Sequence, residues 1–152
     1  MKTLATLLIL GSLSIASCSK SDDSLSNTTD TSAQKNEIQG KTWTISSYID
    51  KGKDETYHFS GYSFTFGENG IFSATTSGSE FTGSWSISSK HTGFDDSGNH
   101  SNNSNKFIIT ATGNDQMDEL SDDFMIVSIS STEIILKDDN PTKVKELKFS
   151  RK

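Results

Sequence analysis

The chain is poor in cysteine, proline and basic side chains, and each shortage excludes something. Its 152 residues contain one cysteine, Cys18, so no disulfide can form within the chain. The single proline is Pro141, so the rest of the chain contains no proline that would interrupt strand pairing. Acidic residues number 20 against 14 basic ones, giving a net charge of −6. Nucleic acid is therefore not an expected partner, because phosphate backbones require a basic protein surface.

Long apolar runs are also missing, except at the N-terminus. After Lys2, residues 4–15 form a mostly apolar run of twelve, followed by the small residues Ala16 and Ser17. Twelve residues are too few to cross a membrane as a helix, which needs about 20. A positive start, an apolar core and small residues at its end are typical of a secretory signal peptide. The sequence therefore predicts a removable signal over residues 1–17.

The run Ile15-Ala16-Ser17-Cys18 resembles the lipobox of bacterial lipoproteins, in which an aliphatic residue and two small residues precede an invariant cysteine. In that family the cysteine carries a diacylglycerol thioether, the signal is cut before it, and the new amine is acylated. The resemblance implies that Cys18 is a lipidation site and that acyl chains make the membrane a partner. Two or three chains anchor stably, since each buried methylene contributes about 0.8 kcal/mol.

Residues 18–35 are expected to form a lipidated, flexible tether, because they are rich in Ser, Thr, Asp and Asn. The opening Ser19-Lys20-Ser21-Asp22-Asp23 is similar to a short acidic signal that routes lipoproteins to the cell surface in some Gram-negative bacteria. The similarity implies a lipid-anchored protein of the bacterial outer membrane, exposed at the cell surface. In the alternative interpretation, the two aspartates only keep the tether solvated.

Residues 36–152 are expected to form one β-rich domain. All fourteen aromatic residues lie between Trp43 and Phe149, and apolar side chains alternate with polar ones in a period of two. In the first strand, this alternation places Ile45 and Ile49 on the face of Trp43 and Tyr48 on the opposite face. Residues 33–39 are consistent with one short turn of helix. Strands are expected at residues 41–49, 62–66, 71–76, 81–88, 106–111, 124–129, 133–137 and 144–150.

Eight short strands joined mostly by tight turns favour an up-and-down barrel or a sandwich. The domain resembles the lipocalin-like domains of bacterial lipoproteins, which implies an all-β antiparallel barrel of about eight strands. The resemblance rests on Gly40-Lys41-Thr42-Trp43, on Tyr62-Ser63-Phe64-Thr65-Phe66 with Gly70, on Gly83-Ser84-Trp85, on Leu120-Ser121 before Phe124, and on Leu147-Lys148-Phe149.

The same resemblance implies a small, mostly apolar ligand inside the barrel. The aromatic residues expected to line its site are Trp43, Tyr62, Phe64, Phe66, Phe81 and Trp85. The alternative is a structural or interaction module whose filled barrel displays loops to a protein or glycan partner. An eight-stranded barrel is just wide enough for either arrangement, and a cavity of several hundred Å³ would favour the ligand.

Candidate residues for chemistry are scattered. His91 and His100 lie in the polar stretch 90–105 together with Asp95 and Asp96, and these four residues are a possible set of metal ligands, although their spacing is not diagnostic. His58 is a third candidate and stands alone in the sequence. A second group of carboxylates lacks the order of a calcium loop and also suits a charged turn with Ser121 as a helix cap. That group is Asp115, Asp118, Glu119, Asp122 and Asp123. With no nucleophile elbow and no phosphate-binding loop, the sequence predicts no enzyme, no cofactor and no metal.

Overall fold

The computed structural model describes residues 31–89, 105–138, 140 and 142–152. Its strands form one nine-stranded antiparallel sheet. In chain order the elements are α1 (Thr31–Ile38), β1 (Thr42–Asp50), β2 (Lys53–Asp54), the 3₁₀ helix η1 (Thr56–Phe59), β3 (Ser63–Phe66), β4 (Ile71–Thr76), β5 (Ser79–Ser88), β6 (Lys106–Ala111), α2 (Asp115–Leu120), β7 (Asp122–Ile129), β8 (Glu133–Asp138) and β9 (Glu146–Arg151).

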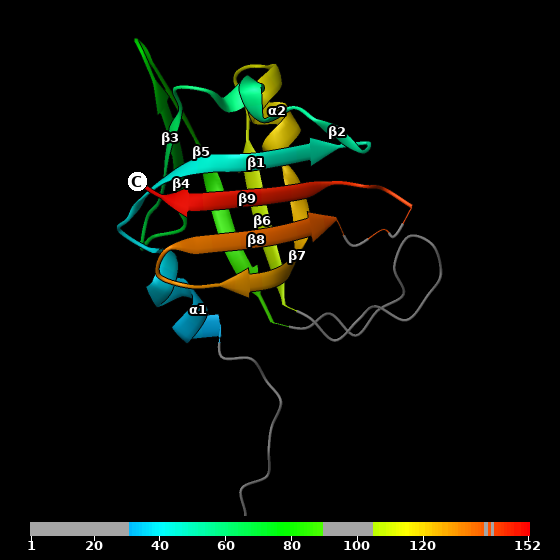
Figure 1. The fold of residues 1–152 in the computed structure, drawn as a ribbon. Coiled ribbons are helices and arrows are strands. Elements are labelled where there is room, and N and C mark those ends of the chain that lie inside the picture. The colour runs from blue at the N-terminus through cyan, green and yellow to red at the C-terminus, as the bar shows by residue number, and fades with distance from the viewer. Residues whose placement is uncertain (1–30, 90–104, 139, 141) are drawn as a thin grey trace, which may run out of the picture.

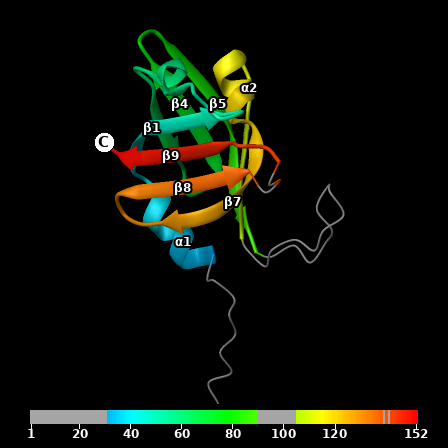
Figure 2. The same ribbon diagram turned by 45° about the vertical axis from the view of Figure 1, so that its right-hand side comes forward.

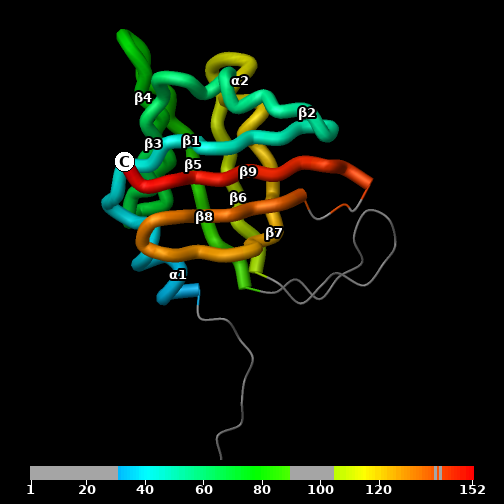
Figure 3. The backbone as a smooth tube through the Cα atoms, viewed as in Figure 1, coloured from blue at the N-terminus to red at the C-terminus, as the bar shows by residue number. Residues whose placement is uncertain are grey.

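The sheet closes on itself because β1 pairs with both β3 and β9 (Figure 1). The remaining barrel strands pair in sequence order from β3 to β9, so the barrel is of the up-and-down type. Strand β2 pairs only with β1 and stands outside the closed ring, as the backbone trace in Figure 3 shows. The expected fold class, a small antiparallel barrel of eight strands, is therefore confirmed, with one short strand added.

Helices lie at the two ends of the barrel. Helix α1 lies at one end, while α2 and η1 lie at the other (Figures 1 and 2). The side chain of Ile38 in α1 is fully buried, and its carbonyl accepts a hydrogen bond from Trp43 Nε1 at 3.1 Å. Helix α1 is longer than the single turn expected at 33–39 and takes in residues 31–35, the end of the predicted tether.

Strand β1 contains a bulge that the alternation pattern did not predict. Its register against β9 shifts between Ile45 and Ser47, which adds one residue and reverses the faces of the residues that follow. The side chain of Tyr48, expected on the outer face, is therefore buried at 1% exposure, and Ile49 is only half-buried. The predicted phase is wrong after the bulge, while Trp43 and Ile45 before it are buried as expected.

The predicted strand positions agree closely with the structure. Strands β4 and β6 have the expected bounds, and residues 67–70 form the expected turn between β3 and β4, with Gly70 at φ 79°. Helix α2 follows the cap residue Asn114, whose side chain accepts a hydrogen bond from Met117 N. Ser121, expected to cap a short helical turn, is the C-terminal cap of α2, and its backbone N–H donates to the Asp118 carbonyl. Cys18 and residues 90–104 lie outside the described part of the chain.

Candidate functional site

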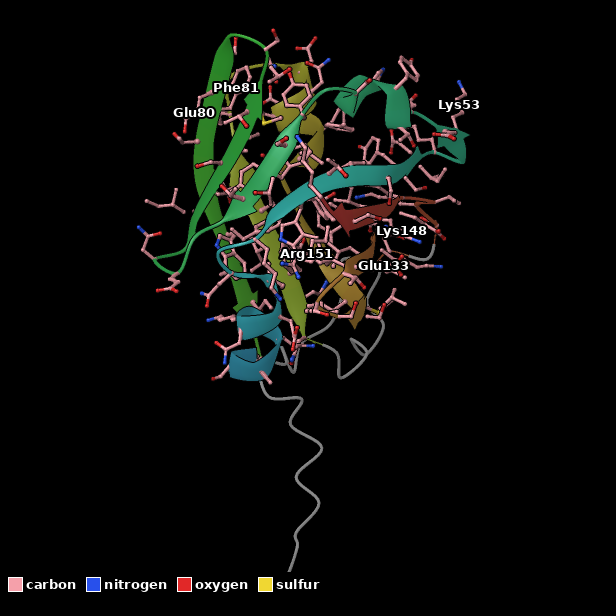
Figure 4. The ribbon with its side chains drawn as sticks, turned by 60° about the vertical axis from the view of Figure 1, so that its left-hand side comes forward. Lys53, Glu80, Phe81, Glu133, Lys148 and Arg151 are labelled. Carbon is pink, nitrogen blue, oxygen red and sulfur yellow. The ribbon has the colours of Figure 1, made fainter. Side chains whose placement is uncertain are left out.

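The structure brings the six aromatic residues expected to bind a ligand into, or against, the barrel core. Trp43, Phe64 and Phe66 have no exposed surface, and Trp85 is 4% exposed. Tyr62 and Phe81 are partly buried and pack against the same core. In Figure 4, Phe81 is labelled on β5 next to the exposed Glu80.

Phe66 lies at the centre of a dense cluster of rings. Its centroid is 5.3 Å from Trp85, 5.4 Å from Phe107, and 5.5 Å from both Phe72 and Phe149. Aromatic rings in direct contact have centroids 4.5–7 Å apart, so these side chains touch one another. The four partners come from β4, β5, β6 and β9, so one ring joins strands from different sides of the barrel.

Polar atoms within this aromatic layer already have partners in the protein. Trp85 Nε1 donates a hydrogen bond to the Gly67 carbonyl at 3.0 Å. The Tyr62 hydroxyl accepts one from Asn114 Nδ2 at 3.0 Å. These groups hold the turn after β3 and the start of α2 in place, which is what core residues do. Binding of an apolar molecule by the six residues stays a prediction.

A charged cleft lies outside the aromatic core, between the turn after β1 and the segment that leads into β9. Its volume is about 270 Å³. The lining residues are Asp50, Lys51, Asp122, Asp138, Lys143, Val144 and Lys145. None of the six predicted ligand-binding residues belongs to this lining.

Acidic and basic side chains pair across the cleft. Lys145 Nζ lies 2.7 Å from Asp122 Oδ2 and 5.3 Å from the centroid of the Phe124 ring. Lys143 Nζ is 4.0 Å from Asp138 Oδ2, a carboxylate whose side chain is only 5% exposed. The three lysines and three aspartates cancel in charge, so the cleft has no net attraction for an anion or a cation. Similar pairs line the outer wall, where Lys148 of β9 meets Glu133 of β8 (Figure 4).

A histidine and two glutamates converge at the α2 end of the barrel. One potential ligand atom from each of Glu55, His58 and Glu119 lies within 4.8 Å of the other two. His58 Nδ1 is 3.0 Å from Glu119 Oε2, and both side chains are partly exposed, at 23% and 31%. The hydrogen bond that His58 donates to the Glu119 carboxylate, together with the charges of Glu119 and Glu55, raises the pKa of His58 above its ordinary value.

Tyr48 forms hydrogen bonds with two members of this trio, Glu55 and Glu119. Its carbonyl accepts a hydrogen bond from Glu55 N at 2.9 Å, and its hydroxyl donates to the Glu119 carbonyl at 3.3 Å. Burial of the phenol, together with the carboxylates of Asp50 and Glu119, raises the pKa of Tyr48 well above its usual range. The hydroxyl therefore stays protonated and remains a donor at physiological pH. One buried residue thus positions the backbone of both glutamates, Glu55 through its carbonyl and Glu119 through its hydroxyl.

The acidic group noted in the sequence is divided by the fold. Asp122 pairs with Lys145 and Asp123 with Lys106, so each has its own cation. Glu119 instead faces His58, a residue 61 positions earlier in the chain. The trio was missed because its members share no sequence motif and meet only when η1 packs beside α2. The possible metal set of His91, His100, Asp95 and Asp96 lies outside the described residues.

The comparisons with known proteins give one structural likeness. The chain is similar in structure to a DUF4847 family protein from Bacteroides vulgatus ATCC 8482, at 13% sequence identity and a TM-score of 0.47. The likeness covers 76% of this chain and 95% of that one. No protein-family profile matches the sequence, and neither does a curated protein. Within the described residues, no helix has the length and apolar character needed to cross a membrane.

Proposed function

We propose that the chain is a lipid-anchored lipoprotein of the bacterial outer membrane and that its lipocalin-like barrel is a non-enzymatic binding module. The anchoring rests on Cys18, the only thiol, which follows Ile15, Ala16 and Ser17 in the order of a lipobox. Helix α1, with which the described part of the chain begins, lies at one end of the barrel (Figure 1). Fully extended, the chain between Cys18 and Thr31 spans at most about 45 Å.

The packed interior is the observation that carries the choice of binding mode. Rings around Phe66 are in direct contact, and the polar atoms of Trp85 and Tyr62 are used within the protein. A ligand in the interior would have to displace these contacts, each of which contributes to stability. The exterior of the barrel is therefore the better binding surface, and the charged cleft is its candidate site.

The chemistry of the cleft favours a small, neutral ligand rich in hydroxyl groups, such as one sugar unit of a glycan. Ammonium groups donate hydrogen bonds and carboxylates accept them, so a hydroxyl can bond with either. A charge-balanced lining gives no advantage to an ionic ligand. A volume of about 270 Å³ lies just below the usual range of small-molecule sites, which suits a ligand of the size of a single sugar.

Replacing Cys18 with alanine should abolish membrane anchoring. Without the thiol no thioether can form, so we expect soluble or unprocessed protein in place of a membrane-bound form. Intact mass spectrometry of detergent-extracted protein from a Gram-negative host is the measurement. The unaltered chain should begin at Cys18 and carry two or three acyl chains, whereas a mature mass without acyl groups would refute the anchor.

Lys143→Ala should weaken sugar binding about ten-fold, because a hydrogen bond from a charged donor contributes about 1.5 kcal/mol. The sample for this test is the mature chain from position 18 carrying Cys18→Ser. It is titrated with a panel of monosaccharides, and binding is followed by changes in the amide chemical shifts. Lys137→Ala is the matched control, since Lys137 also forms an ion pair, with Glu146, but lies outside the cleft.

Two results would contradict this proposal. Equal loss of affinity in both lysine variants would show that the cleft is not the site. Stoichiometric binding of a fatty acid with a change in tryptophan fluorescence, and no response to any sugar, would instead support an apolar ligand inside the barrel. The fatty acid is therefore titrated in parallel with the sugars.

A further inference from the structure

We infer that Glu55, His58 and Glu119 form a binding site for a divalent transition-metal ion of the zinc type. The inference goes beyond the proposed binding module and does not depend on the lipid anchor or on the charged cleft. Its basis is three side chains, two from the segment of η1 with its cap residue Glu55 and one from α2, that present one nitrogen and two carboxylate groups to a common point.

The spacing of the three groups suits a small ion. Zinc holds nitrogen and oxygen ligands at about 2.1 Å in a tetrahedral arrangement, which separates neighbouring ligand atoms by about 3.4 Å. His58 Nδ1 and Glu119 Oε2 are 3.0 Å apart, close to that separation. The largest separation within the trio is no more than 4.8 Å. Because the side chains are partly exposed, small rotations are enough to bring the atoms to bonding distance, and water completes the fourth position.

The local charge also favours a cation. Two glutamates face one histidine here, and in the described part of the chain neither Glu55 nor Glu119 forms an ion pair with a lysine or arginine. By contrast, Asp122 and Asp123 at the start of β7 each have a lysine partner. A divalent ion would neutralise the uncompensated negative charge at this position and leave the ion pairs around it intact.

The protein holds the backbone of these residues in a fixed arrangement. The Tyr48 carbonyl accepts a bond from Glu55 N, the Glu55 carbonyl accepts one from His58 N at 3.0 Å, and the Tyr48 hydroxyl donates to the Glu119 carbonyl. The Tyr48 amide in turn donates to Thr56 Oγ1 at 2.9 Å. Groups behind the ligands that fix their positions are typical of metal sites, because they reduce the reorganisation that binding requires.

The ligand set distinguishes among the common divalent ions. Calcium takes six to eight oxygen ligands, and magnesium prefers oxygen in strict octahedral geometry. One imidazole with two carboxylates is instead a set that zinc and its neighbours accept. The site should therefore bind Zn²⁺ in the presence of a large excess of Ca²⁺ and Mg²⁺.

Titration calorimetry with Zn²⁺ tests the inference on the mature chain carrying Cys18→Ser, which removes the thiol as a competing ligand. We expect one ion per chain, and at least about ten-fold weaker binding in each of Glu55→Gln, His58→Gln and Glu119→Gln. Glu55→Gln is the most informative variant, since none of the hydrogen bonds described around the trio involves its side chain. Near-ultraviolet circular dichroism checks that every variant remains folded.

Two controls separate this site from others. Glu80→Gln removes an exposed carboxylate from β5 (Figure 4), and the double variant His91→Gln, His100→Gln removes the other two histidines. Both should keep the affinity of the parent chain, and Zn²⁺ should shift the imidazole resonances of His58. Unchanged affinity in Glu55→Gln and His58→Gln, loss only in the double histidine variant, or displacement of Zn²⁺ by equal Ca²⁺ would each overturn the assignment.

Discussion

Replacing Trp85 with alanine should lower the free energy of unfolding by about 3–5 kcal/mol, the usual cost of removing a large aromatic side chain from a core. The indole is 4% exposed and its ring lies 5.3 Å from Phe66 and 5.6 Å from Phe107. Its Nε1 also donates to the Gly67 carbonyl, which loses that partner in the variant. Urea denaturation followed by far-ultraviolet circular dichroism is the measurement.

Two variants calibrate this result. Trp85→Phe keeps a ring in the core and loses mainly the bond to Gly67, so it should cost less than half as much. Ile71→Ala removes an apolar side chain that is 46% exposed and should cost well below 1 kcal/mol. A loss below about 1 kcal/mol for Trp85→Ala would contradict the described packing and the inward face assigned to β5.

The fold was predictable because the strands alternate in a period of two and are separated by clear turns. Strands β4 and β6 begin and end at the expected residues, and Trp85 and Ile87 are buried as their positions on β5 require. Burial on one face of each strand leaves few registers that keep aromatic side chains out of water. Closure into an eight-stranded barrel follows from short, sequential antiparallel pairings.

The errors in the prediction come from features that do not follow this period. The bulge between Ile45 and Ser47 has no sequence signature, yet it moves Tyr48 from the expected outer face into the core. Strand β2 consists of two polar residues, Lys53 and Asp54, and exists only because it pairs with the end of β1. Local pattern carries no information about such tertiary effects.

The candidate sites were less predictable than the fold. The aromatic residues were identified, but no pattern in a sequence distinguishes a filled barrel from one with a cavity, since the same side chains face inward in both. His58 and Glu119 meet at 3.0 Å although 61 positions separate them. The residues of the charged cleft come from four separate segments. Such sites become visible only when the packing of the elements is known.

Gly83→Ala should be among the most damaging single-atom additions to this barrel, with a loss of about 3 kcal/mol or more in the free energy of unfolding. Gly83 lies in β5, opposite Phe72 of β4 and Ala111 of β6. A methyl group there would overlap the backbone oxygen of Thr110 and lie 2.9 Å from Ala111 Cα. Because these obstacles are backbone atoms, β6 itself must move to admit the new carbon.

Neighbouring variants show whether this close approach is the cause. Ser84→Ala adds no atom on the inner face and should change stability by less than about 0.5 kcal/mol, since Ser84 is exposed. Adding Thr110→Ala to Gly83→Ala should restore nothing, because the obstructing oxygen belongs to the backbone rather than the side chain. Thermal unfolding of the four proteins measures both effects. Full rescue by Thr110→Ala would contradict the proposed clash, as would a Gly83→Ala protein as stable as the parent chain.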